Sequence, residues 1–355
     1  MKRTARILLS LLLVFCLSFS FVSCAIPEDI FSELPEGIFP DAPESPEDPP
    51  AKNPQVPTPT EGELSVHFLD VGQADAILIL DGDKTMMIDT GDWPNGEDKA
   101  YMLSYIESLG ITVIDYLVLT HPDADHIGGA PEVINTFDVK NCIMPNATKT
   151  SAVFERTIKA LEDNEVNVIL PVPGDDYTLK NASFRILAPI NEKYKDSNDY
   201  SVVLRMQYGE KSILFTGDAE TLSESEMLEK YTAADLKADV LKVSHHGSST
   251  SSTQTFLDLV DPDYAVISCG VGNSYGHPHS AVIDRLNARE LALFRTDTQG
   301  TIVLKTDGKE LSLEALGKRN EDAAAAYTVE YLYFNRKLSA IIAINSLFVG
   351  FPREL

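Results

Sequence analysis

The placement of histidine is the feature that most restricts how this sequence can fold. Six of its seven histidines lie in three short clusters, and each cluster directly follows an apolar run typical of a β-strand. The clusters are His121 and His126 in "THPDADH", His245 and His246 in "SHHGSS", and His277 and His279 in "YGHPHS". In layered α/β proteins the strand ends share one edge, where ligands commonly bind. We therefore expect these residues to converge there with Asp218 of "LFTGD", whereas His67, alone on an alternating strand, is interpreted as structural.

Residues 63–317 mix short β-rich runs with helical segments. "ELSVHFLD", "DAILIL" and "KTMMID" precede the helical "DKAYMLSYIESLG", and the same mixture continues to a closing hairpin, "GTIVLKTDG" with "ELSLEAL". The apolar spacing distinguishes the two kinds of segment. Strand groups interrupted by helices predict a layered α/β domain with sheets inside and helices outside.

The first 62 residues predict export and anchoring. Residues 1–23 join a basic start to a long apolar run, as in a signal peptide. "FVSC" resembles a lipobox, so Cys24 would be lipidated; an uncleaved membrane helix is the alternative. Residues 24–62 are rich in proline and acidic residues and predict an extended linker. We expect a lipoprotein on the extracytoplasmic face of a bacterial membrane, and we predict no role for the tail, residues 318–355.

The formal net charge of −25 argues against broad contact with a nucleic-acid backbone, which requires clustered Lys and Arg. A small or single-stranded anionic substrate stays compatible, because bound cations reverse the local field. Cys142 and Cys269 fall in the folded region and neither belongs to a C-x-x-C pair. An exported protein would allow a disulfide between them, and the sequence leaves that question open.

The spacing H-x-D-x-D-H over residues 121–126 predicts a metal site. On an irregular loop, His121 and Asp123 can face one ion while Asp125 and His126 face a second. Imidazole and carboxylate groups are ligands of divalent metals. A plain polar turn is the alternative, but the ordered motifs "TGD", "HHGS" and "GHPH" downstream argue against it.

Together these motifs resemble the metallo-β-lactamase fold, and specifically the hydrolase domain of ComEC-type DNA-uptake proteins. The resemblance is carried by "FLDVGQADAILI", "IDTG", "THPDADHIGG", "SNDYSVVLR", "LFTGD", "LKVSHHGS" and "NSYGHPH". It implies an α/β domain with the four-layer αββα fold, here as a stand-alone lipoprotein with a dinuclear metal site. The multi-span part of ComEC-type proteins is absent from this sequence, and the sequence leaves open whether a separate membrane channel is a partner.

The resemblance also implies a role for each candidate site residue. The metal ligands would be His121 and Asp123 for the first ion, Asp125, His126 and His277 for the second, and Asp218 as the bridge between them. Asp89 and Asp70 would support these ligands from behind. His246, or its neighbour His245, would donate a proton or contact an oxyanion, and Asp125 would also take part in catalysis.

Two departures from the wider fold family affect the expected metal. Asp123 stands where the family usually has a second histidine. No histidine occurs between residues 127 and 244, so Asn198 is the nearest substitute ligand. Both changes replace nitrogen with oxygen, which favours Mn²⁺, with Zn²⁺ as the alternative. For Asp70, Gln73 and Asp75 of the "DVGQ" signature, a structural turn is at least as well supported as catalysis.

The expected activity is hydrolysis of DNA or a related phosphodiester by a metal-bridging hydroxide. Two cations would lower the pKa of bound water and neutralise charge on a phosphoryl oxygen. Two alternatives stay open, because this fold hosts many substrates. One is hydrolysis of a lactone, thioester or β-lactam at the same site; the other is a surface lipoprotein that binds DNA or another ligand without turnover.

Overall fold

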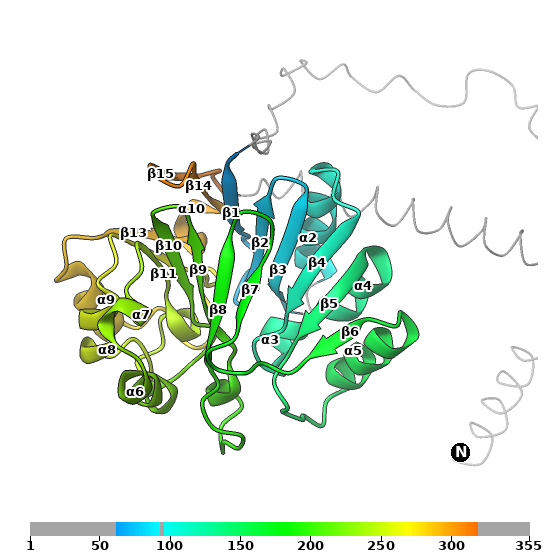
Figure 1. The fold of residues 1–355 in the computed structure, drawn as a ribbon, viewed down its shortest axis with the longest axis horizontal. Helices are drawn as coiled ribbons and strands as arrows, with labels where there is room; N and C mark the ends of the chain where they lie inside the picture. Colours follow the sequence, from blue (N-terminus) through cyan, green and yellow to red (C-terminus); the bar gives the residue numbers. More distant parts are fainter. Residues whose placement is uncertain (1–61, 93–95, 319–355) are drawn as a thin grey trace, which may run out of the picture. The chain divides into compact units, whose positions relative to one another are not determined.

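The computed structural model describes residues 62–92 and 96–318, which belong to one compact unit. The predicted signal peptide, Cys24, nearly all of the linker and nearly all of the tail lie outside the described residues. Within the described ranges, no helix is both long and apolar enough to cross a membrane. The described elements form four layers, with two sheets face to face and helices on both outer faces (Figure 1).

Each sheet is built from both halves of the described sequence. The first has the strand order β15 (Leu311–Ala315), β14 (Ile302–Thr306), β1 (Leu64–Phe68), β2 (Ala76–Asp81), β3 (Lys84–Thr90), β4 (Val113–Val118), β5 (Asp138–Ile143) and β6 (Asn167–Ile169). The second has the order β13 (Ala292–Arg295), β12 (Tyr264–Ile267), β11 (Val240–Lys242), β10 (Lys211–Phe215), β9 (Val203–Tyr208), β8 (Ser183–Ala188) and β7 (Asp176–Thr178). The predicted four-layer αββα architecture is therefore confirmed.

Helices cover the outer face of each sheet (Figure 1). Those beside the first sheet are α2 (Gly96–Ser108), α4 (Ala130–Thr136) and α5 (Ala152–Asp163), and those beside the second are α6 (Thr221–Lys230), α7 (Ala233–Leu236), α8 (Gln254–Val260) and α9 (Ser280–Asn287). The short segments α3 (Ala124–Ile127), η2 (Asn198–Tyr200), η3 (Ser244–Gly247) and α10 (Thr296–Gln299) lie in loops that follow strands.

Three apolar cores hold the layers together. Between the sheets, the rings of Phe68 and Phe215 lie 6.3 Å apart and join β1 to β10. Leu103 of α2 belongs to the core outside the first sheet, and Phe256 of α8 belongs to the core outside the second. Each such fully buried side chain contributes about 1.5–3 kcal/mol to folding.

Parallel pairing brings the loops that carry the motifs to one edge. β3 and β4 are parallel in the first sheet, and β10, β11 and β12 are parallel in the second. The loops after β4, β10, β11 and β12 contain the three histidine clusters and Asp218. Because carboxyl ends of parallel strands share an edge, these loops meet, as the sequence predicted.

Some local features differ from the sequence-based expectations or complete them. The predicted closing hairpin is present, but β14 also pairs with β1 and so extends the first sheet. β6, β7 and β13 at the sheet edges were not predicted, because three or four residues are too few to show a period. Cys142 and Cys269 are buried and unpaired in different cores. His67 is buried and contacts Tyr105 and Ser65 through its two ring nitrogens, as a structural histidine should.

Candidate metal centre

Four side chains from three loops form the centre of the site. The nearest ligand atoms of Asp125, His126, Asp218 and His246 all lie within 4.8 Å of one another. Asp125 and His126 lie on α3 after β4, Asp218 follows β10 and His246 follows β11. The two sheets thus contribute two residues each to one cluster.

The donor atoms of this cluster fit a divalent cation. His126 Nε2 lies 3.3 Å from Asp218 Oδ2, and His246 Nε2 lies 3.4 Å from Asp125 Oδ2 and 3.6 Å from Asp218 Oδ2. Both Nε2 atoms and Asp218 Oδ1 are buried without a hydrogen-bond partner. Buried polar atoms without partners are costly and rare in native proteins. A cation that accepts lone pairs from these atoms would remove that cost.

Asp89 fixes the ring of His126 from behind. Its Oδ2 accepts a hydrogen bond from His126 Nδ1 at 2.8 Å. Thr120 donates to the same carboxylate from its main-chain nitrogen at 2.8 Å and from its hydroxyl at 2.7 Å. A proton on Nδ1 leaves the lone pair of Nε2 directed at the cluster, and such carboxylate–histidine pairs commonly orient metal ligands.

His246 is held in an equivalent way from the second sheet. Its Nδ1 donates to the carbonyl oxygen of Ser268 at 2.9 Å and lies 3.4 Å from Asp75 Oδ1. Nε2 is therefore the nitrogen that faces Asp125 and Asp218. The buried Nε2 atom has no hydrogen-bond partner.

The turn that carries the paired histidines is strained. His245 and His246 both adopt left-handed backbone conformations, with φ of 49° and 52°. Gly247 follows at φ 81°, and a Cβ there would lie 2.5 Å from Pro278 Cβ. Left-handed non-glycine residues cost of order 1–3 kcal/mol each and cluster at functional sites. The turn directs two successive imidazoles toward one region of the molecule.

His121 and Asp123 adjoin the cluster on the other side. His121 is buried, its Nε2 has no hydrogen-bond partner, and its ring centroid lies 4.1 Å from that of His126. Asp123 Oδ1 lies 2.6 Å from the ammonium of Lys149. These two residues could hold a second cation next to the first.

The remaining predicted ligands lie at the rim. His277 is half-buried, and its Nδ1 lies 3.3 Å from Gln73 Nε2. Asn198 donates from Nδ2 to Glu220 Oε1 at 3.4 Å. Both line the cavity above the cluster, and His277 does not belong to the group of four clustered ligands.

Sequence reasoning missed Glu220. Its Oε1 accepts hydrogen bonds from His245 Nδ1 at 3.0 Å and from the Thr250 hydroxyl at 2.8 Å. His245 Nε2 is then left 3.6 Å from Asp218 Oδ2. The position of Glu220 two residues after Asp218 was the one signal in the sequence, and its partner lies 25 residues further along the chain.

A buried ion pair ties the sheets together behind His246. Lys242 Nζ at the end of β11 lies 2.7 Å from Asp75 Oδ2 just before β2, and both side chains are 1% exposed. Asp75 therefore supports the site. Asp70, from the same "DVGQ" signature, does not line the cavity, and its main-chain nitrogen donates to the Thr301 hydroxyl at 3.0 Å.

Neighbouring charges shift the pKa values of several side chains in the centre. Burial lowers the pKa of His246, but Asp218 and Asp75 outweigh burial and raise that pKa to about 10. Burial also opposes protonation of His126, yet Asp218 and Asp89 raise its pKa well above the ordinary value. Burial raises the pKa of Asp218, but His126 and His246 hold it well below the ordinary value. The centre therefore takes up protons that a cation would displace.

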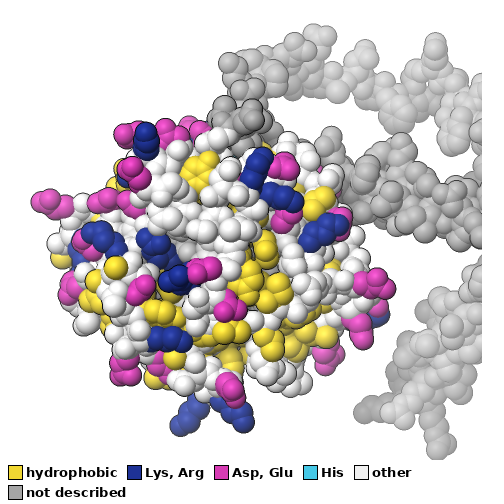
Figure 2. Space-filling model, viewed as in Figure 1, with side chains coloured by type: hydrophobic (Ala, Val, Ile, Leu, Met, Phe, Trp, Pro, Cys, Tyr) yellow, Lys and Arg dark blue, Asp and Glu magenta, His cyan; other side chains and the backbone are white. Residues whose placement is uncertain are grey.

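The cluster lies beneath an open cavity of about 130 Å³. Its lining consists of Gln73, Asp123, Asp125, Asn198, Asp218, His245, His246, Tyr275 and His277. This lining is polar and rich in acidic groups. On the face seen in Figure 2, basic and acidic side chains are interspersed, without one extended basic patch.

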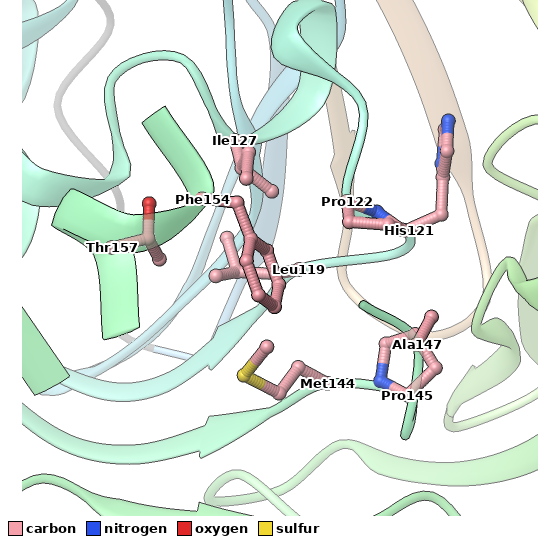
Figure 3. Close-up of a pocket in the computed structure, with 9 residues that line it drawn as sticks. All are labelled: Leu119, His121, Pro122, Ile127, Met144, Pro145, Ala147, Phe154 and Thr157. Atoms are coloured by element: carbon pink, nitrogen blue, oxygen red, sulfur yellow. The ribbon is translucent and has the colours of Figure 1, made fainter. Parts of the chain in front are cut away.

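A second, apolar pocket lies on the other side of the His121 loop. Leu119, Met144 and Phe154 face one another in it, while His121 points away from them (Figure 3). Its free volume is about 10 Å³, roughly the space of one water molecule. The pocket is therefore packing that supports the loop rather than a ligand site.

A four-layer αββα fold with a His/Asp metal centre at the shared edge of its sheets defines a class of metallo-hydrolase. The Metallo-beta-lactamase superfamily model matches residues 69–271, and the chain belongs to this superfamily.

Several named relatives share most of the described region. The chain is 31% identical over 258 residues to ComE operon protein 3 of Bacillus subtilis, covering 68% of this chain and 33% of that protein. It is 34% identical over 239 residues to Recombination protein 2 of Haemophilus influenzae, covering 67% and 28%. It is 32% identical over 242 residues to Competence protein ComA of Neisseria gonorrhoeae, covering 68% and 32%. The chain thus spans about a third of the length of these relatives.

Among solved structures, the chain is similar to the metallo-beta-lactamase fold protein YhfI of Bacillus subtilis, with a TM-score of 0.47 and 13% identity over 69% of this chain and 100% of that one.

Proposed function

We propose that the protein is a metal-dependent phosphodiesterase that holds two divalent cations, Mn²⁺ or Zn²⁺, and cleaves DNA or a related phosphodiester. The observation that carries this proposal is the cluster of buried, unpartnered imidazole and carboxylate atoms beneath an open cavity. Relatives named as competence and recombination proteins support a nucleic-acid substrate. Cations held here would lower the pKa of bound water and neutralise charge on a phosphoryl oxygen.

The geometry supports a ligand set that differs from the expected one. We assign His246, rather than His277, to the second ion, because its Nε2 lies 3.4–3.6 Å from the carboxylates of Asp125 and Asp218. The proposed sets are His121 and Asp123 for the first ion, Asp125, His126 and His246 for the second, and Asp218 as the bridge. His277 and Asn198 then belong to the substrate-facing rim.

His245 takes the role of proton donor in this proposal. Glu220 accepts the Nδ1 proton of His245, so Nε2 faces the cavity beside Asp218. In its protonated, imidazolium form His245 carries a proton on each ring nitrogen. As water attacks phosphorus and the bond to the leaving oxygen breaks, Nε2–H would transfer its proton to that oxygen and leave a neutral ring whose remaining proton, on Nδ1, is donated to Glu220. General acid catalysis of this kind contributes about 10²- to 10⁴-fold in rate.

Variants of the paired histidines test these assignments. His246→Gln should lose one of two bound ions together with activity, whereas His245→Gln should keep both ions and lose about 10²- to 10⁴-fold in kcat. His279→Gln is the matched control, because His279 Nδ1 accepts a hydrogen bond from Ser249 N and the residue does not line the cavity. Full metal content in His246→Gln would overturn its assignment as a ligand.

A substrate panel separates the competing functions. Hydrolysis of bis(p-nitrophenyl) phosphate, nitrocefin and a thioester should be compared with Mn²⁺ and with Zn²⁺. Turnover of the phosphodiester supports the proposal. Preference for nitrocefin or the thioester would favour acyl hydrolysis, and binding of DNA without turnover of any substrate would favour a ligand-binding lipoprotein.

We also propose, from the sequence alone, that the chain is exported and anchored through lipidated Cys24, with a separate membrane channel as a partner. Metabolic labelling with radioactive palmitate tests the anchor. Label in the wild-type chain but not in Cys24→Ser supports lipidation, and no label in either chain would refute it.

A further inference from the structure

The loop between β12 and α9 presents an exposed aromatic ring at the cavity. Tyr275 is 66% exposed and lines the same cavity as Asp125 and Asp218. It is the one aromatic residue among the exposed large apolar side chains of the described ranges. Val271 on the same loop is also exposed, at 72%, but does not line the cavity. An exposed ring beside a concave polar site is a candidate contact for a ligand.

Neighbouring groups hold this ring in place. Tyr275 stacks on His277, with centroids 5.6 Å apart and planes 21° apart. Asn273 accepts a hydrogen bond from His277 N at 3.0 Å and donates to Gly270 O at 2.9 Å and His277 O at 2.6 Å. Gln73 accepts from Gly270 N at 3.0 Å. The loop is thus braced, and little ordering entropy would be lost when a ligand binds.

The rings continue inward to the metal centre. His277 lies 6.2 Å from His246, with planes 26° apart, so His246, His277 and Tyr275 form a series of nearly parallel rings from the centre to the rim. One face of Tyr275 packs on His277, and the exposure of the residue leaves surface for a planar partner.

The charge of the cavity lining determines which part of a substrate can contact the ring of Tyr275. Asp123, Asp125 and Asp218 line the cavity, so an anionic group is favoured only where cations neutralise them. A neutral, flat group next to the phosphodiester suits the rim. Every nucleobase has such a face, and stacking on an aromatic side chain contributes about 1–3 kcal/mol per base.

We propose that Tyr275 stacks an unpaired nucleobase beside the scissile phosphodiester, so that the site selects a single nucleic-acid strand over other phosphodiesters. This inference rests on the proposed phosphodiesterase function. Tyr275 is a specificity-determining residue and takes no part in bond cleavage.

Two matched substrates test the proposal. One is a short single-stranded oligonucleotide, and the other is the same backbone with abasic tetrahydrofuran residues in place of every nucleoside. For the natural strand, Tyr275→Ala should raise KM about 5- to 150-fold with kcat nearly unchanged, and Tyr275→Phe should stay near the wild type. For the abasic strand, all three proteins should have the same KM. Val271→Ala is the matched control and should leave both substrates unaffected.

The outcomes separate failure of the proposed phosphodiesterase function from failure of the stacking role of Tyr275. If the wild-type chain cleaves neither strand nor bis(p-nitrophenyl) phosphate with Mn²⁺ or Zn²⁺, the proposed function fails and the stacking role fails with it. If it cleaves bis(p-nitrophenyl) phosphate but neither strand, stacking is refuted while the phosphodiesterase stands. If the wild type cleaves both strands but Tyr275→Ala changes KM equally for each, or for neither, stacking is refuted while the phosphodiesterase stands. Loss of stacking can also be read directly, because quenching of 2-aminopurine in the strand on binding should disappear in Tyr275→Ala and persist in Tyr275→Phe.

Discussion

The buried ion pair of Lys242 and Asp75 leads to a specific prediction about the free energy of unfolding. Lys242→Met keeps the length of the side chain and removes its charge. Burial raises the pKa of Asp75, but Lys242 and His246 outweigh burial and lower it from 3.8 to about 2. That difference corresponds to about 2.5 kcal/mol in favour of the charged carboxylate. Removing one partner also leaves a buried charge uncompensated, so we expect a loss of about 3–5 kcal/mol in the free energy of unfolding.

The pH dependence identifies the cause of that loss. In the wild type, the lowered pKa of Asp75 contributes stability above pH 3.8 that is lost as the pH falls toward 2. Without Lys242, only His246 and His126 oppose the effect of burial, so the pKa of Asp75 rises from its wild-type value. The variant should therefore be most destabilised at neutral pH and recover relative to the wild type as the pH falls toward 4.

Denaturant unfolding of metal-free protein at pH 7.5 and pH 4 measures both effects. Lys237→Met is the matched control, because Lys237 pairs with Asp261 on the surface with both side chains more than 60% exposed, and its loss should leave stability nearly unchanged. Lys242→Met combined with Asp75→Asn should regain part of the loss. A loss below 1 kcal/mol, or an equal loss at both pH values and in the double variant, would refute the reasoning.

Three further predictions concern the metal centre. The pKa of His246 is raised to about 10 and that of His126 is also raised, so both imidazoles are protonated at pH 7 without metal. Metal binding should therefore release about two protons per chain, and metal affinity should rise with pH. Calorimetry in buffers of different ionisation enthalpy measures the number of protons released. Asp89→Asn should weaken metal binding about 10- to 100-fold in a chelator competition assay, because it loosens the ring of His126. Glu220→Gln should lower kcat with metal content unchanged, because it alters the partner that orients His245; loss of metal in this variant would contradict that role.

The layers of the fold and the edge that carries the site were predictable from the sequence. Alternating strands and helices indicated a layered domain, and strand-end motifs had to converge because β10, β11 and β12 are parallel. The H-x-D-x-D-H spacing located Asp125 and His126 in one loop. These inferences depend on local pattern, which a single sequence carries.

Which histidine of the second sheet lies next to Asp218 was not predictable from the sequence. His246 and His277 both follow strands of the second sheet, and nothing in "HHGS" or "GHPH" shows which ring reaches Asp218. The strained turn at His246 and the brace from Ser268 decide it in space. Lys242 sits on a short buried strand, where an apolar residue would be the ordinary expectation. Pairings across sheets leave no periodic signal, so such residues are found only from the structure.

Metal content and phosphodiesterase activity, measured on the same purified sample, test the central claim most directly. We predict two divalent ions per chain at saturation. Hydrolysis of bis(p-nitrophenyl) phosphate should be lost on chelation and restored by Mn²⁺ or Zn²⁺. A chain that binds two ions but hydrolyses no phosphodiester would contradict the activity, and a chain that binds none would contradict the metal centre itself.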